Sequence, residues 1–332
     1  MTQPLIQVQH LTKNYRVPVR PEGLSASLKS LLNPQYSEVT AVRDVSFDID
    51  AGAMVGLIGP NGAGKTTTLK MLSGLLHPTS GAATVAGHTP WERHPSYLRR
   101  ISMVMGNKSQ MLWDIPPMDS FRVLGEIYAV PPAEFRRTVD ELIALLDMQE
   151  LLTKPVRNLS LGERMKCELT ASLLHRPAVL FLDEPTLGLD VSMQLRLRRF
   201  LAEYNQRSGV TVILTSHYMA DVLALCPRVI LIHHGRLFYD GELSGLAQRL
   251  APFKLLRMTL RDENGRSSND GVLPSGVEIT ERGPNQLTLR TSRVEAPAIT
   301  ARLLQTLPVV DLVVEDPPIE AVIDQIYREG GL

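Results

Sequence analysis

The sequence predicts an α/β protein whose main sheet is mostly parallel, followed by a small α+β extension. A buried strand, a glycine-rich turn and the start of a helix follow one another at 54–68. Three more short apolar strands are expected at 178–182, 210–214 and 229–232. Beyond residue 243 the pattern changes to short strand-like runs separated by polar turns. We therefore expect a main domain over residues 1–243 and an accessory domain over residues 244–332.

The other elements of the main domain can be placed by their apolar spacing. Alternating apolar residues predict strands at 6–15 and 41–50. Two shorter strands are expected at 82–86 and 97–105. Apolar residues then recur at helical spacing, so a helical subdomain over about 107–174 interrupts the sheet.

Two segments lie outside this α/β pattern. An insertion at 17–39 places leucines along one face of a short helix at 24–32, and this face either covers a sheet edge or meets a partner or a membrane surface. The accessory domain has strand-like runs at 254–260, 286–289 and 309–314, with one or two helices. It carries no clustered histidines or cysteines and no glycine loops, so we expect it to have no chemistry of its own.

Composition excludes several classes of protein. The 332 residues include 44 % hydrophobic residues, and the formal net charge is +0, so overall basicity does not indicate nucleic-acid binding. No run approaches the roughly eighteen apolar residues that a membrane span needs. Cys167 and Cys226 cannot form a disulfide framework, and we expect both to be small core residues in a reducing compartment.

The turn after the strand at 54–58 matches the pattern G-x-x-x-x-G-K-[ST]. Its glycines let backbone N–H groups converge on an anion, and the positive end of the following helix favours the same anion. Lys65 is expected to reach the β- and γ-phosphates, and Thr66 to offer its hydroxyl to Mg²⁺. The sequence therefore predicts a nucleoside triphosphate site formed by Gly59, Pro60, Asn61, Gly62, Ala63, Gly64, Lys65, Thr66 and Thr67.

Two acidic residues end the apolar strand at 178–182. The carboxyl end of a buried parallel strand is where such sheets bind ligands. Asp183 is expected to hold Mg²⁺ through water, as the second acidic element of a phosphate-loop NTPase. Glu184 is then placed to polarise the attacking water as a general base.

Three further motifs follow in a fixed order. The segment 159–163 reads Leu-Ser-Leu-Gly-Glu, 185–190 reads Pro-Thr-Leu-Gly-Leu-Asp, and 215–217 reads Thr-Ser-His. Together with the phosphate loop and the acidic pair, they resemble the ATP-binding subunits of ATP-binding cassette (ABC) transporters, over roughly residues 5–243. The resemblance implies a phosphate-loop NTPase of ABC type, with a mostly parallel core sheet, an antiparallel β subdomain and a helical subdomain that carries the family signature L-S-G-G-Q.

The resemblance also implies roles for individual residues. Tyr15 is similar to the aromatic residue on which adenine stacks, and His217 to the switch histidine that contacts the γ-phosphate. The signature begins a helix, so Ser160 and the N–H of Gly162 would form a second anion site, completed when two copies face each other head to tail. The implied set is catalytic Glu184, His217 and Lys65; ATP-binding Tyr15, Ser160, Gly162, Glu163 and Asp190; and Mg²⁺-binding Thr66, Asp183 and Asn107.

The chain departs from the family pattern at three positions. Leu161 replaces a signature glycine, so that backbone position is not expected to need a positive φ. Glu163 replaces the final glutamine and adds a carboxylate that faces nucleotide phosphates, ribose or solvent. Asn107 aligns with the glutamine that senses Mg²⁺ in the family, although Gln110 is an alternative.

We therefore predict a motor subunit that hydrolyses ATP, with Mg²⁺, to drive a separate membrane permease, of the export-type subgroup. Its other partner is expected to be a second copy, with no nucleic acid, and its location the cytoplasmic face of the cell membrane. The apolar loop 111–115 either docks a helix of the permease or forms a lid over the helical subdomain.

Two alternatives remain at this stage. One is a soluble ABC ATPase acting on the ribosome or on nucleic acid, although such relatives usually carry two cassettes or a coiled-coil insertion. The other is a regulatory protein that holds ATP without turnover, which would require a damaged catalytic set. The substrate, the direction of transport and the role of residues 244–332 cannot be read from the sequence.

Overall fold

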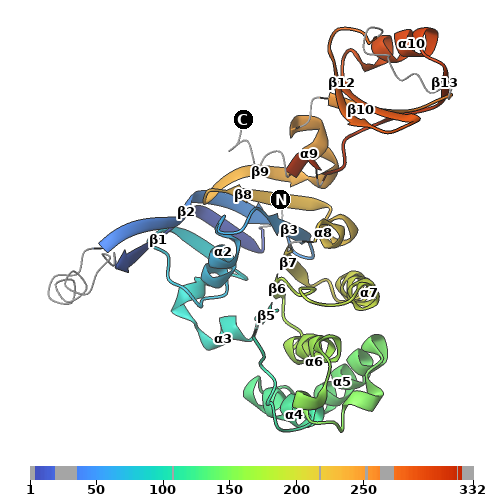
Figure 1. Cartoon of the computed structure of the whole chain (residues 1–332). Coiled ribbons are helices and arrows are strands. Elements are labelled where there is room, and N and C mark those ends of the chain that lie inside the picture. Colours follow the sequence, from blue (N-terminus) through green and yellow to red (C-terminus); the bar gives the residue numbers. More distant parts are fainter. Residues whose placement is uncertain are drawn as a thin grey trace, which may run out of the picture. The chain divides into compact units, whose positions relative to one another are not determined.

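A computed structural model describes residues 4–18, 36–106, 108–216, 218–250, 253–261, 273–319 and 321–323 of the chain. It divides into two compact units, Met1–Gly241 and Glu242–Leu332, which are described separately below (Figure 1). The helix expected at 24–32 lies outside the described residues, and so do Asn107 and His217.

A six-stranded sheet forms the centre of the first unit, in the order β5-β6-β7-β3-β8-β9. The pairs β5–β6, β6–β7, β7–β3 and β3–β8 are all parallel. Each of β3, β6 and β7 is buried along its whole length, as expected for a parallel sheet covered on both faces. The strands are β3 (Met54–Ile58), β5 (Ile101–Met105), β6 (Val179–Asp183), β7 (Thr211–Thr215), β8 (Arg228–His233) and β9 (Arg236–Glu242).

Successive residues of β3 face opposite layers, as the period of two in a strand requires. A Cβ atom at Gly56 would contact Val222 and Cys226, so this face meets α8 (Met219–Leu225), next to α7 (Val191–Ser208). Val55 and Leu57 belong instead to a core cluster with the first helix, α2 (Lys65–Leu72).

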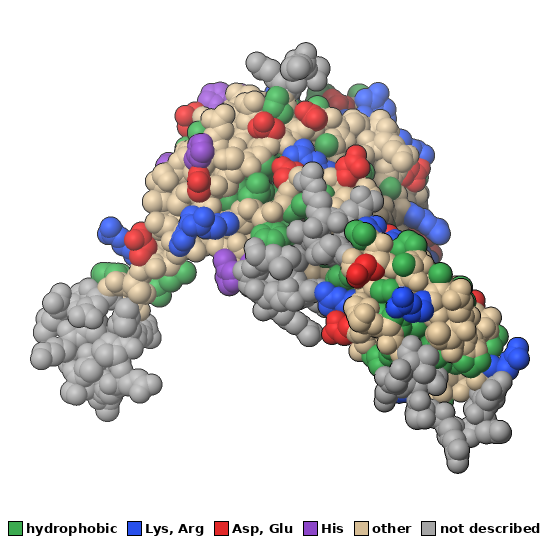
Figure 2. Space-filling view, turned by 90° about the horizontal axis from the view of Figure 1, so that it is seen from above, with side chains coloured by type: hydrophobic (Ala, Val, Ile, Leu, Met, Phe, Trp, Pro, Cys, Tyr) green, Lys and Arg blue, Asp and Glu red, His purple; other side chains and the backbone are tan. Residues whose placement is uncertain are grey.

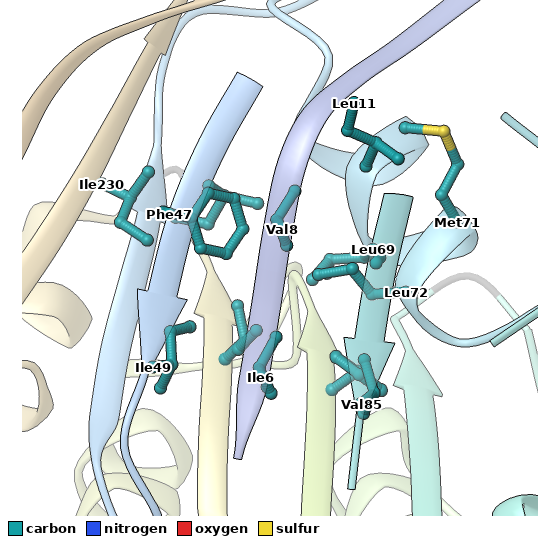
Figure 3. Packing of buried hydrophobic residues seen from close by; sticks show 14 of the residues in the cluster. Ile6, Val8, Leu11, Phe47, Ile49, Leu69, Met71, Leu72, Val85 and Ile230 are labelled. Atoms are coloured by element: carbon teal, nitrogen blue, oxygen red, sulfur yellow. The ribbon is translucent and has the colours of Figure 1, made fainter. Parts of the chain in front are cut away.

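That cluster joins the sheet and α2 to an antiparallel layer of three strands, in the order β2-β1-β4. The strands are β1 (Ile6–Pro18), β2 (Tyr36–Ile49) and β4 (Ser80–Val85). Side chains from all three layers interdigitate, including Val8, Phe47, Leu69, Leu72 and Ile230 (Figure 3). Leu69 and Leu72 are fully buried, and each contributes about 2 kcal/mol by leaving water.

The predicted helical region consists of three helices that are grouped together in Figure 1. They are α4 (Pro117–Ile127), α5 (Pro132–Leu146) and α6 (Leu161–Leu173), with short 3-10 turns at Gln149–Leu151 and Val156–Asn158. Both α4 and α5 begin with proline at the first turn, where a missing N–H costs nothing. Helix α6 packs on both α4 and α5 and contacts β5.

Several expected boundaries are wrong, for identifiable reasons. The strand expected at 97–105 begins at Ile101, because Pro95–Leu98 forms the short helix α3 after a 3-10 turn at Pro90–Glu92. The Tyr97 side chain is fully buried, and its hydroxyl donates to the Leu72 carbonyl, which holds this segment out of the sheet. The strand expected at 82–86 ends at Val85, since Ala86 has a positive φ of 49°.

The second unit contains a four-stranded sheet in the order β11-β12-β10-β13. The pairs β11–β12, β12–β10 and β10–β13 are all antiparallel, and α10 packs over the apolar residues of β10 and β12. The predicted α+β pattern is present here, although α9 and β11 were not expected. The elements are α9 (Leu243–Leu250), β10 (Phe253–Leu260), β11 (Val277–Arg282), β12 (Gln286–Ser292), α10 (Ala296–Thr306) and β13 (Val309–Glu315).

Among the described residues, no helix is both long enough and apolar enough to cross a lipid bilayer. The longest, α7, has 18 residues and is rich in arginine. On the face seen in Figure 2, acidic and basic side chains are interspersed and do not gather in a large patch of one sign. This mixture agrees with the net charge of +0.

Candidate nucleotide-binding site

The loop between β3 and α2 has a backbone that only glycine can adopt at its two fixed positions. Gly59 has φ of 154°, and a Cβ atom there would lie 2.1 Å from the Ile232 carbonyl oxygen. Gly64, which caps α2, has φ of 108°, and its Cβ would lie 2.4 Å from the Ala41 carbonyl oxygen. Strands β8 and β2 therefore press the loop from two sides and fix its curvature.

Lys65 is buried although it carries a charge, with 6 % of its surface exposed. Its Nζ donates to the Gly59 carbonyl at 2.6 Å and to the Pro60 carbonyl at 3.0 Å. Burial lowers the pKa of this ammonium, while the carboxylates of Glu184 and Asp183 act in the opposite direction. The cation is therefore directed into the glycine-rich loop and lies close to both acids.

Asp183 is the shared acceptor of hydroxyl groups from two other segments. Its Oδ1 accepts from Thr66 Oγ1 at 3.0 Å and from Thr215 Oγ1 at 2.8 Å. The first hydroxyl comes from the start of α2 and the second from the end of β7, beside β6. The sequence had predicted that Thr66 and Asp183 share one site, and the structure brings them into contact.

Glu184, one residue beyond the strand, has a left-handed backbone with φ of 56°, which is uncommon for a residue with a side chain. Its N–H donates to the Thr215 carbonyl at 3.1 Å. On the other side, a Cβ atom at Gly106 would lie 2.5 Å from the Glu184 carbonyl oxygen. Neighbouring segments thus hold an unfavourable conformation in place, as is frequent at functional sites.

Sequence reasoning missed a buried polar network behind this site. Asp221 of α8 is fully buried and accepts hydrogen bonds from Thr186 Oγ1, from Ser216 Oγ at 2.7 Å and from Arg198 Nε at 2.6 Å. Thr186 follows Glu184 by two residues, and Ser216 directly follows the end of β7 at Thr215. The only signal in the sequence was an acidic residue among the apolar positions of a short helix.

The segment that resembles the family signature forms the start of α6. Ser160 is the N-cap, and its Oγ accepts from the Glu163 N–H at 3.3 Å. Glu163 Oε2 in turn accepts from the Ser160 N–H at 2.8 Å, which completes a capping box. These hydrogen bonds lower the pKa of the Glu163 carboxyl. The carboxylate of Glu163 therefore bonds its own helix start, an orientation that was not among those expected from the sequence.

The neighbouring motif 185–190 packs against the same helix start. A Cβ atom at Gly188 would lie 3.1 Å from Leu161 Cδ2, and one at Gly162 would lie 2.9 Å from the Met193 side chain. Leu161 itself is the first residue of α6 and has no positive φ. Asp190 caps α7, since its Oδ1 accepts from the Met193 N–H at 2.9 Å.

The remaining predicted residues are placed as follows. Tyr15 pairs with Val39 on β2, the strand whose Ala41 contacts the glycine-rich loop, and Lys13 Nζ lies 5.3 Å from the centre of its ring. The Gln110 side chain donates to the Glu168 carbonyl at 3.2 Å. His217 and Asn107 lie outside the described residues, so their contacts are not part of the site geometry.

These observations define a class of protein: an α/β phosphate-loop protein that binds a nucleoside triphosphate at the carboxyl edge of its sheet. A family model described as "ABC transporter" matches residues 42–187. The ABC transporter ATP-binding protein NatA of Bacillus subtilis is 34 % identical over 208 residues, which cover 63 % of this chain and 84 % of the relative. The daunorubicin/doxorubicin resistance ATP-binding protein DrrA of Streptomyces peucetius is 30 % identical over 272 residues, 82 % of each chain.

Solved structures agree with this assignment. The ATP-binding subunit of an ABC transporter superposes with a TM-score of 0.61 at 25 % identity, covering 74 % of this chain and 92 % of that one. An ATP-binding cassette solved as a dimer with ADP and phosphate shares the fold, with a TM-score of 0.58 at 20 % identity, over 72 % of this chain and 98 % of that one. The chain belongs to the family of ABC transporter ATP-binding proteins, and it is an ATP-hydrolysing subunit of an ABC transporter. ATP-binding subunits of this family work with membrane permease subunits.

Proposed function

We propose that this chain powers a separate export-type permease by closing, with a second copy, around two ATP molecules. The observation that carries the proposal is the grouping of Lys65, Thr66, Asp183 and Glu184 at one edge of the sheet. The names of relatives support the export subgroup: DrrA confers drug resistance in Streptomyces peucetius, and a Nod factor export protein of Ralstonia nicotianae is 35 % identical over 218 residues, 64 % of this chain and 65 % of the relative.

Within the site, Lys65 would bind the β- and γ-phosphates and Glu184 would act as the general base toward water. Thr66 and Asp183 supply a hydroxyl and a carboxylate oxygen 3.0 Å apart, the hard oxygen ligands that suit Mg²⁺. Bound there, Mg²⁺ would neutralise charge on the phosphates. His217 would contact the γ-phosphate, and Asn107 would provide the amide that senses Mg²⁺.

On the opposing copy, Ser160 and the N–H groups at the start of α6 would bind the γ-phosphate. A helix N-terminus favours an anion because its first N–H groups lack partners within the helix. Glu163 would act by keeping this helix start rigid, since its carboxylate accepts from the Ser160 N–H. Tyr15 and Asp190 would complete the ATP contacts.

The dimer is tested by light scattering of the Glu184→Gln variant. This change removes the general base and leaves the phosphate-binding groups intact, so ATP should trap a stable dimer. The matched control is Glu184→Gln combined with Ser160→Arg, whose side chain blocks the opposing anion site. The proposal predicts dimers for the first protein and monomers for the second. If both variants remain entirely monomeric at saturating ATP, the two-copy arrangement is contradicted.

A groove on the first unit supplies a surface for the permease. It has a volume of about 450 Å³ and is lined by the end of α2, α3, β5 and the end of α4. Leu75, Leu98, Met103 and Ile127 make it apolar, and Ile127 is 66 % exposed. We propose that an amphipathic helix from a cytoplasmic loop of the permease occupies it, with the half-exposed Leu112 and Trp113 as a second contact.

The partner is identified by purifying the tagged full chain from detergent-solubilised membranes of its host, followed by mass spectrometry. A stoichiometric polytopic membrane protein is expected, and Ile127→Asp should release it without changing ATP hydrolysis by the isolated chain. Leu223→Asp, at a similarly exposed apolar residue of α8 that does not line the groove, is the control. Recovery of ribosomal proteins or nucleic acid, with no membrane protein, would favour the soluble-ATPase alternative.

A further inference from the structure

A buried carboxylate on α6 holds the loop that leaves the nucleotide site. Glu168 is 6 % exposed, and its side chain accepts from Ser109 Oγ and from the Gln110 N–H at 3.1 Å. Gln110 Nε2 donates in return to the Glu168 carbonyl at 3.2 Å, and the Met111 N–H donates to Ser109 Oγ at 3.1 Å. We call Ser109, Gln110 and Glu168 the α6 clamp.

The rest of this loop is attached to the same side. The Leu112 N–H donates to Ser120 Oγ of α4, and the Arg164 guanidinium of α6 lies 5.2 Å from the centre of the Trp113 ring. The Trp113 carbonyl accepts from the Arg157 N–H at 3.0 Å, directly before the signature. Residues 109–113 therefore belong to the helical subdomain.

The other end of the loop is attached to the catalytic edge. The Gly106 N–H donates to the Asp183 carbonyl at 3.0 Å, and Gly106 is packed so closely against the Glu184 carbonyl that no side chain fits. Only residues 107 and 108 separate this anchor from the α6 clamp. A connection this short transmits a displacement of either anchor to the other.

Burying the Glu168 carboxylate in the packed side of α6 costs free energy of folding. Among the described residues, no Lys, Arg or His forms an ion pair with it, and burial raises the pKa of its carboxyl while the hydrogen bonds from Ser109 and Gln110 lower it. Apart from Lys166, the other buried residues of α6 are apolar or carry a hydroxyl or thiol group. A buried carboxylate held by loop donors fixes one register between loop and helix.

We propose that Glu168 is a positioning residue that couples the Mg²⁺-ATP site of one copy to the signature helix that the same copy presents to the other ATP. The inference rests on the proposed two-copy function. When the start of α6 engages the opposing nucleotide, the α6 clamp transmits the displacement to the anchor at Gly106, beside Asp183 and Glu184. Loosening the clamp leaves each site able to bind ATP but impairs their joint closure.

The test separates nucleotide binding from turnover in the full-length chain. Glu168→Gln should leave the Kd of a fluorescent ATP analogue within twofold, because the loop residues to which Glu168 is hydrogen-bonded, Ser109 and Gln110, lie outside the phosphate loop. Its kcat for ATP should fall at least tenfold, since the amide has one acceptor oxygen and cannot accept from both Ser109 Oγ and the Gln110 N–H as the carboxylate does. Ser109→Ala, on the loop, should lower kcat about threefold without risk to the core.

Two further measurements distinguish a role of Glu168 in coupling the two sites from an effect of the substitution on the stability of the fold alone. The double variant Ser109→Ala/Glu168→Gln should be no slower than Glu168→Gln alone, because both changes break the same contact. Ser172→Ala removes another buried hydroxyl of α6, whose Oγ bonds only its own helix, and should leave kcat unchanged.

The inference fails if folded Glu168→Gln keeps the wild-type kcat, or if its loss is matched by Ser172→Ala. It also fails if the two clamp substitutions act additively. Two other results would instead refute the proposed function. One is the absence of ATP hydrolysis by the wild-type chain, and the other is the absence of an ATP-dependent dimer of the Glu184→Gln variant.

Discussion

The two halves of the proposed ATP site are built differently within one chain. On the phosphate-loop side, Lys65 and Asp183 are buried and already hydrogen-bonded to neighbouring segments. On the signature side, Ser160 and Leu161 are exposed, and the helix start is satisfied only by its own capping box. One half is pre-organised by its own core, whereas the other presents an exposed helix N-terminus suited to a partner. The comparison predicts that substitutions on the first side affect ATP binding and chemistry, whereas those on the second side leave ATP binding by the monomer intact and affect dimerisation and turnover.

The largest effect is expected at Glu184, on the phosphate-loop side. Glu184→Gln removes a general base, and such groups contribute about 10²- to 10⁴-fold to rate. The steady-state kcat of phosphate release should fall by that factor while the Kd of the monomer for ATP is unchanged. Glu203→Gln, an exposed acid on α7, serves as the control. Unchanged hydrolysis by Glu184→Gln would show that another group activates the water.

Lys65→Ala comes next and tests binding on the same side. The charge-assisted hydrogen bonds from a buried ammonium to phosphate are worth about 1.5–3 kcal/mol, so the affinity for ATP should fall about 10- to 100-fold. Isothermal titration with the monomer measures the change. Lys70→Ala, in the last turn of the same helix, should bind ATP as the wild type does. Equal losses for both variants would mean that general charge, rather than the loop, attracts the nucleotide.

Ser160 distinguishes the two sides most directly. Ser160→Ala removes an N-cap, which costs about 1 kcal/mol of stability. Ser160→Asp retains a capping oxygen but sets a negative charge against the phosphate of the other copy. The Ser160→Asp variant should therefore melt like the wild type and bind ATP as a monomer, yet lose most of its turnover. Full activity of this variant would place the opposing phosphate away from the start of α6.

The smallest effect is a pH dependence at Glu163. Because hydrogen bonds from Ser160 lower the pKa of Glu163 below its ordinary value of 4.5, the carboxylate stabilises the fold above that pH. This contribution is lost as the pH falls through the lowered pKa. Compared with Glu163→Gln, the wild type should show a slightly higher Tm at pH 7, and the difference should vanish at pH values below the lowered pKa of the Glu163 carboxyl. A difference that grows in acid would reverse the assigned sign.

Local sequence patterns predicted the central strands well because their burial is uniform. The strand at 54–58 was expected with the observed bounds and the helix with the observed start at Lys65, since five buried residues lead into a loop whose conformation requires glycine. Strand β11 was missed because almost all of its side chains are exposed and no apolar alternation marks it. The strand expected from Tyr97 was wrong at its start because that side chain is buried against the Leu72 carbonyl.

Some residues of the candidate site were likewise predicted from the sequence, and others were found only in the structure. The phosphate loop and the acidic pair were found from local sequence patterns, and the signature from its resemblance to the family motif, because each is a short segment whose chemistry depends on neighbouring residues. Glu168 and Asp221 were not found, because their partners lie 59 and 35 residues away in the sequence. Glu163 was recognised as a departure, but only the structure shows that its carboxylate bonds its own N-cap.

The sequence by itself determined the class of fold and the ligand, because phosphate binding needs a glycine-rich loop, a lysine and a hydroxyl at fixed spacing. The tertiary structure decided which polar side chains are shared between segments: Asp183 with two hydroxyls, Asp221 with Thr186 and Ser216, and Glu168 with the loop after β5. Such pairings depend on how distant elements pack, since a buried charge is tolerated only where the fold brings donors to it.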